Sequence, residues 1–210
     1  MEKHTIILDP GHGGIDPRAG KYVTAGKRSF HPVDGAVYYE GVEMRKFAKV
    51  WGQILETAGY DVQFTVNPND YRDVPLSERS RIVNRIAADK KCLLFPIHSN
   101  AANDPTAHGH EVFTSRGITH SDYISKFWMN EMEKCFPGIK MRKDCIDGFP
   151  DKEAGFHMVK KTTCPALYIE LLFHTNDAEV RILRSEGFKR TTGKVLLATI
   201  KRYEEWLRLS

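Results

Sequence analysis

Short apolar runs alternate with amphipathic stretches along this chain, and this alternation limits the possible folds more than any other feature. Residues 5–8, 92–97 and 166–172 form apolar runs that are typical of buried strands. Between them, residues 40–58 and 76–87 carry apolar side chains at three- and four-residue steps, the period of an amphipathic helix. Strands that alternate with helices predict an α/β fold. We expect a single three-layer sandwich, with a mostly parallel sheet flanked by helices.

The other segments extend this prediction without dividing the chain. Further strands are predicted at residues 61–65 and 109–114, and further helices at residues 122–136 and 188–209. Residues 15–39 are rich in Gly, Pro and polar side chains and follow no period, so they are predicted to form a long loop. Residues 137–153 are expected to be irregular. No repeat or linker-like composition interrupts the 210 residues, so one domain over residues 1–210 is expected.

Composition argues against disordered and membrane-spanning chains. Because 41% of the residues are hydrophobic, the chain can build a core, and no stretch approaches the roughly 20 apolar residues that cross a bilayer. The net charge of +4 suits an anionic partner but also fits an ordinary solvated surface. No basic motif or stacking platform indicates binding to nucleic acid. We expect the protein to be a monomer. The arginines of the second helix are expected to be solvated or structural: Arg79, Arg81 and Arg85.

The N-terminus lacks the pattern of a secretory leader. Met1 is followed within five residues by an apolar run that is too short for the core of a signal peptide, and no small-residue cleavage site follows it. We therefore expect a protein that is kept inside the cell until another agent releases it, or the mature form of a secreted protein.

The four cysteines have none of the CxxC spacings of a zinc ribbon or a redox motif, and they are too few for a disulfide framework. We expect reduced and mostly buried thiols. A bridge between Cys135 and Cys145 stays open as an alternative.

Acid, base and metal-binding residue types occur where the predicted strands end. In an open α/β sheet, functional sites lie at the carboxyl ends of strands. His12 follows the first strand, His98 ends the strand at residues 92–97, and Glu170 lies within the last strand, while Glu40 opens the first helix. Two imidazoles and a carboxylate, with a fourth position left for water, form a recurrent catalytic zinc shell. A further carboxylate would act as general base.

Each of these residues also has an ordinary structural interpretation. Taken alone, His12 could hydrogen-bond its own loop, and His98 could be a buried histidine with satisfied partners. A glutamate in the first helical turn, such as Glu40, is stabilised by the helix dipole without any other role. Glu170 is harder to explain structurally, because a carboxylate in an apolar strand is costly unless it is paired, ligated or protonated.

Other histidines have weaker claims. His108 and His110 flank a glycine as an H-x-H pair, which we expect to lie on the surface rather than to bind metal. His157 and His174 flank the last strand and are kept as candidates for contacts around the site or with substrate.

Five motifs then occur in a recognisable order. They are Leu8-Asp-Pro-Gly-His-Gly-Gly-Ile-Asp-Pro17, a Glu ahead of the helix end at Gly59-Tyr60, Leu76-Ser-Glu-Arg79 with Asn84, Ile97-His-Ser-Asn-Ala101, and Pro165-Ala-Leu-Tyr-Ile-Glu170 with Phe173 and Asn176. In this order the chain resembles zinc-dependent N-acetylmuramoyl-L-alanine amidases of the amidase-3 type. These enzymes hydrolyse the amide between the lactyl group of N-acetylmuramic acid and L-alanine in peptidoglycan. The resemblance covers nearly the whole chain.

The resemblance implies roles for the candidate residues and a Zn²⁺ cofactor. His12 and His98 match the two histidine ligands of the family, and Glu170 matches its catalytic glutamate. Counting back from the helix end, the glutamate ligand matches Glu40. Glu43, one turn later on the same helical face, is the rival ligand.

The chain departs from the family pattern at three places. The family usually has Lys after the ligand Glu and Asn further on, where this chain has Gly41 and Met44. The segment between the first His and this Glu is also longer than usual. We hypothesise that it forms a rim of the substrate groove, and the residues involved are Arg28, Phe30, His31 and Tyr38.

The implied partner is peptidoglycan, and the implied enzyme is a lytic amidase such as a phage endolysin, with a bacterial remodelling amidase as the second choice. Two other functions share some of these features. A zinc carboxypeptidase or amidohydrolase acting on peptides would use the same His-Glu-His chemistry. A catalytically inactive cell-wall-binding module would keep the fold alone.

Overall fold

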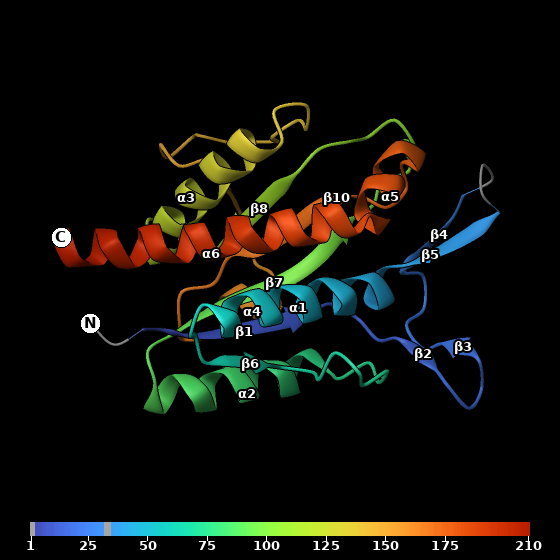
Figure 1. The fold of residues 1–210 in the computed structure, drawn as a ribbon, viewed down its shortest axis with the longest axis horizontal. Coiled ribbons are helices and arrows are strands. Elements are labelled where there is room, and N and C mark those ends of the chain that lie inside the picture. Colours follow the sequence, from blue (N-terminus) through green and yellow to red (C-terminus); the bar gives the residue numbers. More distant parts are fainter. Residues whose placement is uncertain (1–2, 32–34) are drawn as a thin grey trace.

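A six-stranded sheet forms the middle layer of the protein in a computed structural model that describes residues 3–31 and 35–210 (Figure 1). Its strand order is β6-β1-β7-β10-β8-β9. The strands are β6 (Val62–Phe64), β1 (Thr5–Pro10), β7 (Cys92–Asn100), β10 (Tyr168–Phe173), β8 (Glu111–Thr114) and β9 (Lys152–Glu153). The first four are parallel, β8 is antiparallel to β10, and β9 is parallel to β8. The predicted α/β sandwich with a mostly parallel sheet is confirmed.

Helices cover both faces of the sheet. One face packs against α1 (Glu40–Thr57), α3 (His120–Cys135) and α6 (Glu186–Leu209), and the other against α2 (Leu76–Asp89) and α4 (His157–Lys160) (Figure 1). Along β7, Leu93 and Phe95 enter the larger core, whereas Leu94 enters the smaller one. Because these strands are buried on both faces, they read as continuous apolar runs in the sequence.

Residues 15–39 do not form the predicted loop. They fold into two hairpins, β2 (Ile15–Asp16) with β3 (Lys21–Tyr22), and β4 (Arg28–His31) with β5 (Ala36–Tyr39). Figure 1 shows both hairpins beyond the end of β1 from which the chain leaves that strand. Strands of two to four residues are too short to show alternation, so the sequence pattern missed them. Residues 32–34 of this segment lie outside the described residues.

Three further short elements correct the prediction. The segment at residues 137–153 contains β9, and the sequence pattern also missed α4 and α5 (Asp177–Arg184). The side chain of Asn176 caps α5 by accepting hydrogen bonds from the backbone N–H groups of Ala178 and Glu179. Elements of two to eight residues carry at most two turns of periodicity, so their caps and partners define them better than their pattern does.

The cysteines are all free thiols, as expected, but the expectation that most are buried is wrong. Cys135 and Cys145 are exposed, Cys164 is half-buried and Cys92 is buried. Cys135 ends α3, and the bridge to Cys145 is not formed. Cysteine burial follows from the position of each residue in its element, which composition does not reveal.

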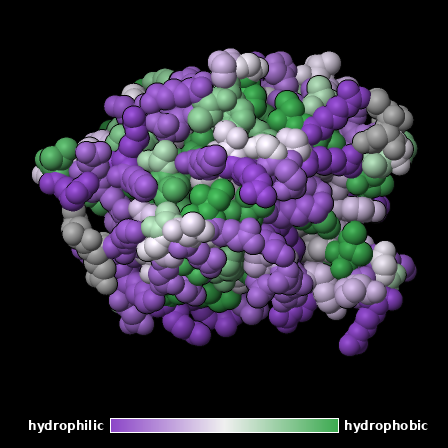
Figure 2. Space-filling model, viewed as in Figure 1, coloured by the Kyte–Doolittle hydropathy of each residue, from purple (hydrophilic) through white to green (hydrophobic). Residues whose placement is uncertain are grey.

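The surface agrees with most expectations from composition. Of the residues that the structure describes, none belongs to a helix that is both long and apolar enough to cross a membrane. The face in Figure 2 is mainly hydrophilic, with small and scattered hydrophobic areas. On α2, Arg81 and Arg85 are exposed, whereas Arg79 is buried.

Candidate metal centre

Three side chains from separate elements meet at the carboxyl ends of β1 and β7. They are His12, which follows β1, Glu40, the first residue of α1, and His98 on β7. One ligand atom from each lies within 4.8 Å of the others. Nε2 of His12 is 3.2 Å from Oε2 of Glu40, and Nδ1 of His98 is 3.1 Å from Oε1 of the same carboxylate. The structure therefore brings together the three residues that the sequence proposed as ligands.

The chain reaches this geometry through an unusual turn after β1. The strands β1 and β7 are parallel neighbours, so their carboxyl ends lie at one edge of the sheet. A Cβ atom on Gly11 would lie 2.2 Å from the ring of His98, so the turn passes this imidazole only with glycine at that position. His12 itself has a φ of 62°, in the left-handed region that non-glycine residues adopt at an energetic cost.

Buried arginines hold that turn in place. The carbonyl oxygen of His12 accepts hydrogen bonds from Nη1 of Arg45 at 2.8 Å and from Nη2 of Arg79 at 3.0 Å. Nη1 of Arg79 also contacts Asp9 at 2.8 Å, and both side chains of this ion pair are buried. Arg79 is therefore structural, one of the two roles expected for it, and it fixes the backbone that presents His12.

Glu40 is held as an anion. Its backbone N–H donates to the carbonyl oxygen of Lys27 at 3.1 Å, and its Oε1 accepts the backbone N–H of Ser99 at 3.2 Å. Burial by itself would raise the pKa of Glu40, but the hydrogen bonds from His12 and His98 outweigh burial and lower it. Burial lowers the pKa of His98, which keeps its imidazole neutral. An anionic carboxylate and a neutral imidazole are the protonation states that bind metal.

The rival ligand Glu43 lies outside this cluster. Its carboxylate contacts Lys46 at 2.6 Å and Lys189 at 3.6 Å. Gly41, the residue after the ligand candidate Glu40, lies in close contact with the turn after β1. A Cβ atom at this position would lie 1.9 Å from the carbonyl oxygen of Gly13, so the start of α1 packs directly against the turn that carries the first histidine.

Glu170 lies opposite His98 in the register of β10 and β7. Its side chain is partly exposed, yet its Oε2 atom is buried and accepts no hydrogen bond from the residues that the structure describes. Burial and then the negative charges of Glu40 and Glu111 raise the pKa of Glu170 well above its usual range, while Lys27 opposes this rise. A buried acceptor without a partner and with a raised pKa is typical of a group that exchanges a proton during a reaction.

Of the aromatic and hydroxyl groups around the centre, Tyr168 and Ser99 were not singled out from the sequence, whereas Tyr38 was expected only as a rim residue. Tyr168 stacks on His98 with ring centroids 4.6 Å apart. Tyr38 donates to Oγ of Ser99 at 3.2 Å and stacks on His174 at 5.4 Å. His174 is one of the two candidate histidines that flank the last strand, and it lies beside the site. Only the position of Tyr168 and Ser99 next to predicted site residues could have indicated them.

His157 and His110 have structural roles away from the centre. His157 contacts Oγ of Ser80 at 3.1 Å, on the face of the sheet covered by α2 and α4. His110 is buried, so the expected surface pair with His108 is wrong. Nε1 of Trp128 donates to Nε2 of His110 at 2.7 Å, and burial lowers the pKa of His110 to about 4. The core around α3 buries this imidazole. The spacing of residues in the sequence does not show such burial.

The hairpin of β4 and β5 is fastened beside the site. The hydroxyl of Ser29 donates to the carbonyl oxygen of His174, and Nδ1 of His31 contacts the carboxylate of Asp177. Two of the four expected rim residues, His31 and Tyr38, are therefore buried against the body of the protein. The other two, Arg28 and Phe30, are exposed.

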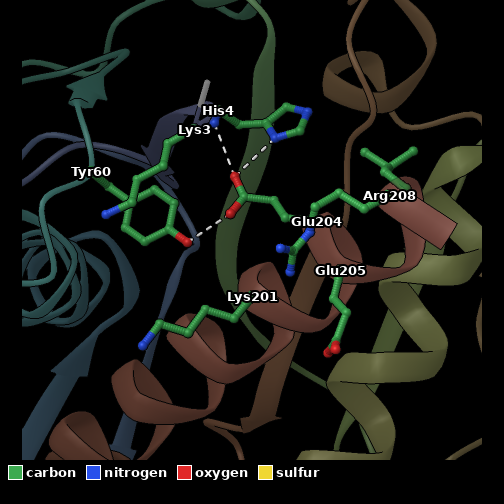
Figure 3. Close-up of a pocket in the computed structure, with 8 residues that line it drawn as sticks. Lys3, His4, Tyr60, Lys201, Glu204, Glu205 and Arg208 are labelled. Carbon is green, nitrogen blue, oxygen red and sulfur yellow. Dashed lines mark hydrogen bonds and ion pairs between the residues drawn. The ribbon is translucent and has the colours of Figure 1, made fainter. Parts of the chain in front are cut away.

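Surface pockets lie at both ends of the sheet. The metal centre borders one of about 320 Å³, which Asp73, Arg79 and His98 help to line. The other, of about 380 Å³, lies at the opposite end of the sheet (Figure 3). There Glu204 accepts hydrogen bonds from the backbone N–H of His4 at 3.0 Å and from the hydroxyl of Tyr60 at 2.9 Å.

Comparisons with known proteins show which family this chain is similar to. AmiA of Escherichia coli K12, an N-acetylmuramoyl-L-alanine amidase, is 23% identical over 242 residues, which cover 97% of this chain and 77% of AmiA. An uncharacterized cell wall amidase of Bacillus anthracis is 26% identical over 98% of this chain, but the match covers 36% of that protein. The chain therefore spans about a third of the second relative.

Solved structures share the fold. The crystal structure of an N-acetylmuramoyl-L-alanine amidase from Clostridium difficile 630 superposes with a TM-score of 0.75 over 98% of each chain, at 21% sequence identity. A family model described as N-acetylmuramoyl-L-alanine amidase matches residues 6–202, which is nearly the whole sequence. This chain belongs to the N-acetylmuramoyl-L-alanine amidase family.

Proposed function

We propose that this protein hydrolyses the amide bond between N-acetylmuramic acid and L-alanine in peptidoglycan, with Zn²⁺ held by His12, Glu40 and His98. The observation that carries the proposal is the convergence of these three ligand atoms within 4.8 Å, with the unpartnered Glu170 carboxylate on the adjacent strand. The substrate class in this proposal is inferred from the family, and the reactive groups are residues of this chain.

The donor set fits zinc. Two imidazole nitrogens and one carboxylate oxygen leave a fourth position, as in catalytic zinc sites. When bound, the ion supplies Lewis acidity and lowers the pKa of water from 15.7 to about 7. The residues themselves orient the ligands. Ser99 holds Oε1 of Glu40 through its backbone N–H, and Tyr168 fixes the plane of His98 by stacking on it.

Glu170 acts as both base and acid in this proposal. Its Oε2 accepts the proton of the water that attacks the lactyl carbonyl. The same oxygen then delivers that proton to the amine of L-alanine, which leaves only when protonated. The raised pKa suits a carboxylate that must hold a proton between the two steps.

The exposed face of the β4–β5 hairpin supplies the rim of the substrate groove. Lys27, Arg28 and Phe30 are exposed, and the backbone of Lys27 is bonded to the ligand Glu40. Peptidoglycan stems carry carboxylates, which these cations would attract. If Arg28→Ala and Phe30→Ala hydrolyse intact walls and soluble muropeptides as fast as the unaltered enzyme, the hairpin is not a substrate rim.

The remaining expectations stay part of the proposal. Residues 1–210 act as one catalytic domain, as a monomer, on peptidoglycan in the cell wall.

Glu43→Gln tests the ligand assignment, because a substitution outside the cluster should leave bound zinc unchanged. Elemental analysis of the purified variant measures this, and loss of zinc would favour Glu43 over Glu40.

Product analysis tests the activity. Digestion of purified peptidoglycan sacculi should release new amino termini of L-alanine without new reducing sugars, and a zinc chelator should stop the release. Mass spectrometry of the fragments distinguishes the alternatives. Release of D-alanine instead would show a carboxypeptidase, and binding to the wall without any product would show an inactive wall-binding module.

A further inference from the structure

Two cysteines face each other at the end of the sheet away from the metal centre. Cys92 begins β7, and Cys164 lies just before β10. Cys92 belongs to the smaller hydrophobic core, and Cys164 packs against the same core. Neither residue takes part in the proposed reaction, so their proximity calls for another explanation.

The register of the two strands places these cysteines opposite each other. The pairs that fix it are His98 with Glu170 and Leu94 with Ala166, which share an offset of 72 residues. The backbone confirms the second pair, because Leu94 bonds the carbonyl oxygen of Pro165 at 2.9 Å and the N–H of Leu167 at 3.0 Å. Two residues earlier, the same offset brings Cys92 beside Cys164, and both residues contact the smaller core.

The two thiols lie close together, because both side chains contact the smaller core and both line the same surface depression. Neighbouring strands lie about 4.8 Å apart, within the range of roughly 4.4–6.8 Å that disulfides span between Cα atoms. The pair can therefore form a bond with little movement of the backbone.

The pair can also be reached from solvent. Both cysteines line a surface depression of about 430 Å³, whose wall includes Lys90 and Lys91. Cys164 is half-buried, whereas Cys92 is only 3% exposed.

We propose that Cys92 and Cys164 form a reversible redox site that closes to a disulfide when a small-molecule disulfide is the oxidant. The thiolate of Cys164, the more accessible sulfur, attacks one sulfur of the oxidant, and the first small thiolate leaves. Cys92 then attacks the sulfur of Cys164, and the second small thiolate leaves. The two protein thiols lose two electrons to the oxidant, and their protons end on the two released thiols.

The bond would act on the strands that carry the reaction. The carboxyl ends of these strands hold His98 and Glu170, which lie opposite each other in the register. A cross-link near the amino ends would therefore fix this register. The cross-link touches neither group. Oxidation should therefore raise thermal stability and leave the rate of hydrolysis unchanged at temperatures where both forms are folded.

The test uses the full chain with Cys135→Ser and Cys145→Ser, which removes the two exposed thiols. Incubation with oxidised glutathione should consume both remaining thiols, with a mass lower by two hydrogens and no bound glutathione. Peptide mapping without reductant should find Cys92 joined to Cys164. The thermal midpoint should rise by several degrees and return after reduction.

Single substitutions complete the experiment in the same background. Cys92→Ser should accumulate one glutathione on Cys164, because nothing resolves the mixed disulfide, whereas Cys164→Ser should react slowly through the buried thiol. Thiol labelling of the native unsubstituted chain repeats the test should a variant fail to fold. Two free thiols after oxidation, or one glutathione on each cysteine, would overturn the proposal. So would a disulfide that leaves the thermal midpoint unchanged.

Discussion

Opposite ends of the sheet each place a glutamate beside a histidine, but the two carboxylates differ in their partners. At the amino ends of the strands, Glu204 accepts hydrogen bonds from His4 and from Tyr60 (Figure 3). At the carboxyl ends, Oε2 of Glu170 is buried and has no hydrogen-bond partner among the described residues. Both ends of the sheet have the same residue types, so the residue types alone do not show which carboxylate is reactive.

The difference shows how a structural carboxylate can be told from a reactive one. Hydrogen bonds from His4 and Tyr60 outweigh burial and lower the pKa of Glu204, so this carboxylate stays charged and satisfied. Burial and neighbouring negative charges raise the pKa of Glu170 instead. A protein tolerates such an unsatisfied group where substrate or a metal ion completes its interactions.

Removal of a histidine should have the largest effect at the carboxyl-end pocket. We expect His12→Ala and His98→Ala to lose bound zinc and with it all hydrolysis, because two remaining ligands do not hold a catalytic ion. His4→Ala, at the other pocket, is the matched control and should keep its zinc. Elemental analysis of the purified proteins measures the content, and equal zinc in all three variants would remove the distinction between the pockets.

The two carboxylates provide the next contrast. Glu170→Gln should lower kcat by at least about 100-fold while zinc stays bound, because the amide cannot accept the proton of the attacking water. Glu204→Gln should leave kcat unchanged and cost about 1 kcal/mol of stability through weakened hydrogen bonds. Turnover of a soluble muropeptide gives kcat. Near-normal turnover by Glu170→Gln would refute its role as base.

A buried carboxylate that is paired with a buried cation should contribute to stability. Asp9→Asn removes the buried anionic partner of Arg79 and leaves it only the more distant carboxylate of Asp73 at 3.7 Å, so we expect a loss of about 3 kcal/mol in the free energy of unfolding. Asp70→Asn is the control, because Asp70 pairs with the exposed Arg72 and should cost less than about 1 kcal/mol. Urea unfolding measures both. Equal losses would show that burial of the pair is unimportant.

His110 should make stability depend on pH. Its pKa in the folded protein, about 4, lies below the unfolded value of 6.5, so the unfolded chain binds more protons between these values. The contribution of His110 is fully present above pH 6.5 and is lost as pH falls toward 4, by about 3 kcal/mol in all.

Denaturant unfolding at pH 7 and pH 5 measures the part of this change that falls between those two pH values. His110→Leu should be less stable at pH 7, because Trp128 loses its acceptor, but its stability should vary less with pH. His108→Gln should keep the pH dependence of the unaltered protein, since His108 is exposed. An unchanged slope in His110→Leu would show that His110 does not titrate in this range.

The segments that the sequence predicted best are long elements with either a continuous apolar run or a sustained helical period. The buried strands β1, β7 and β10 and the long helices α1 and α6 carry a period over a full element, so sequence patterns found them within a few residues. The hairpins at residues 15–39, β9 and α5 depend on partners far along the chain, and their short lengths leave no period to detect.

The same limit applies to the site. Motif order picked out His12, Glu40, His98 and Glu170, because each stands in a short motif beside or within an element that the sequence defines. Arg45 and Arg79 were not identified as supports of the His12 turn. Their hydrogen bonds cross 33 and 67 residues of sequence, and no local pattern encodes such distances.

The sequence by itself determined the class of fold, the order of its main elements and the residue types available for chemistry, because these follow from local periodicity and composition. Only the tertiary structure decided which carboxylate meets the two imidazoles and which lacks a partner. It also decided that Cys92 faces Cys164 in the register of two strands. Burial, partner choice and electrostatics depend on contacts between distant segments, and those contacts exist only once the chain has packed.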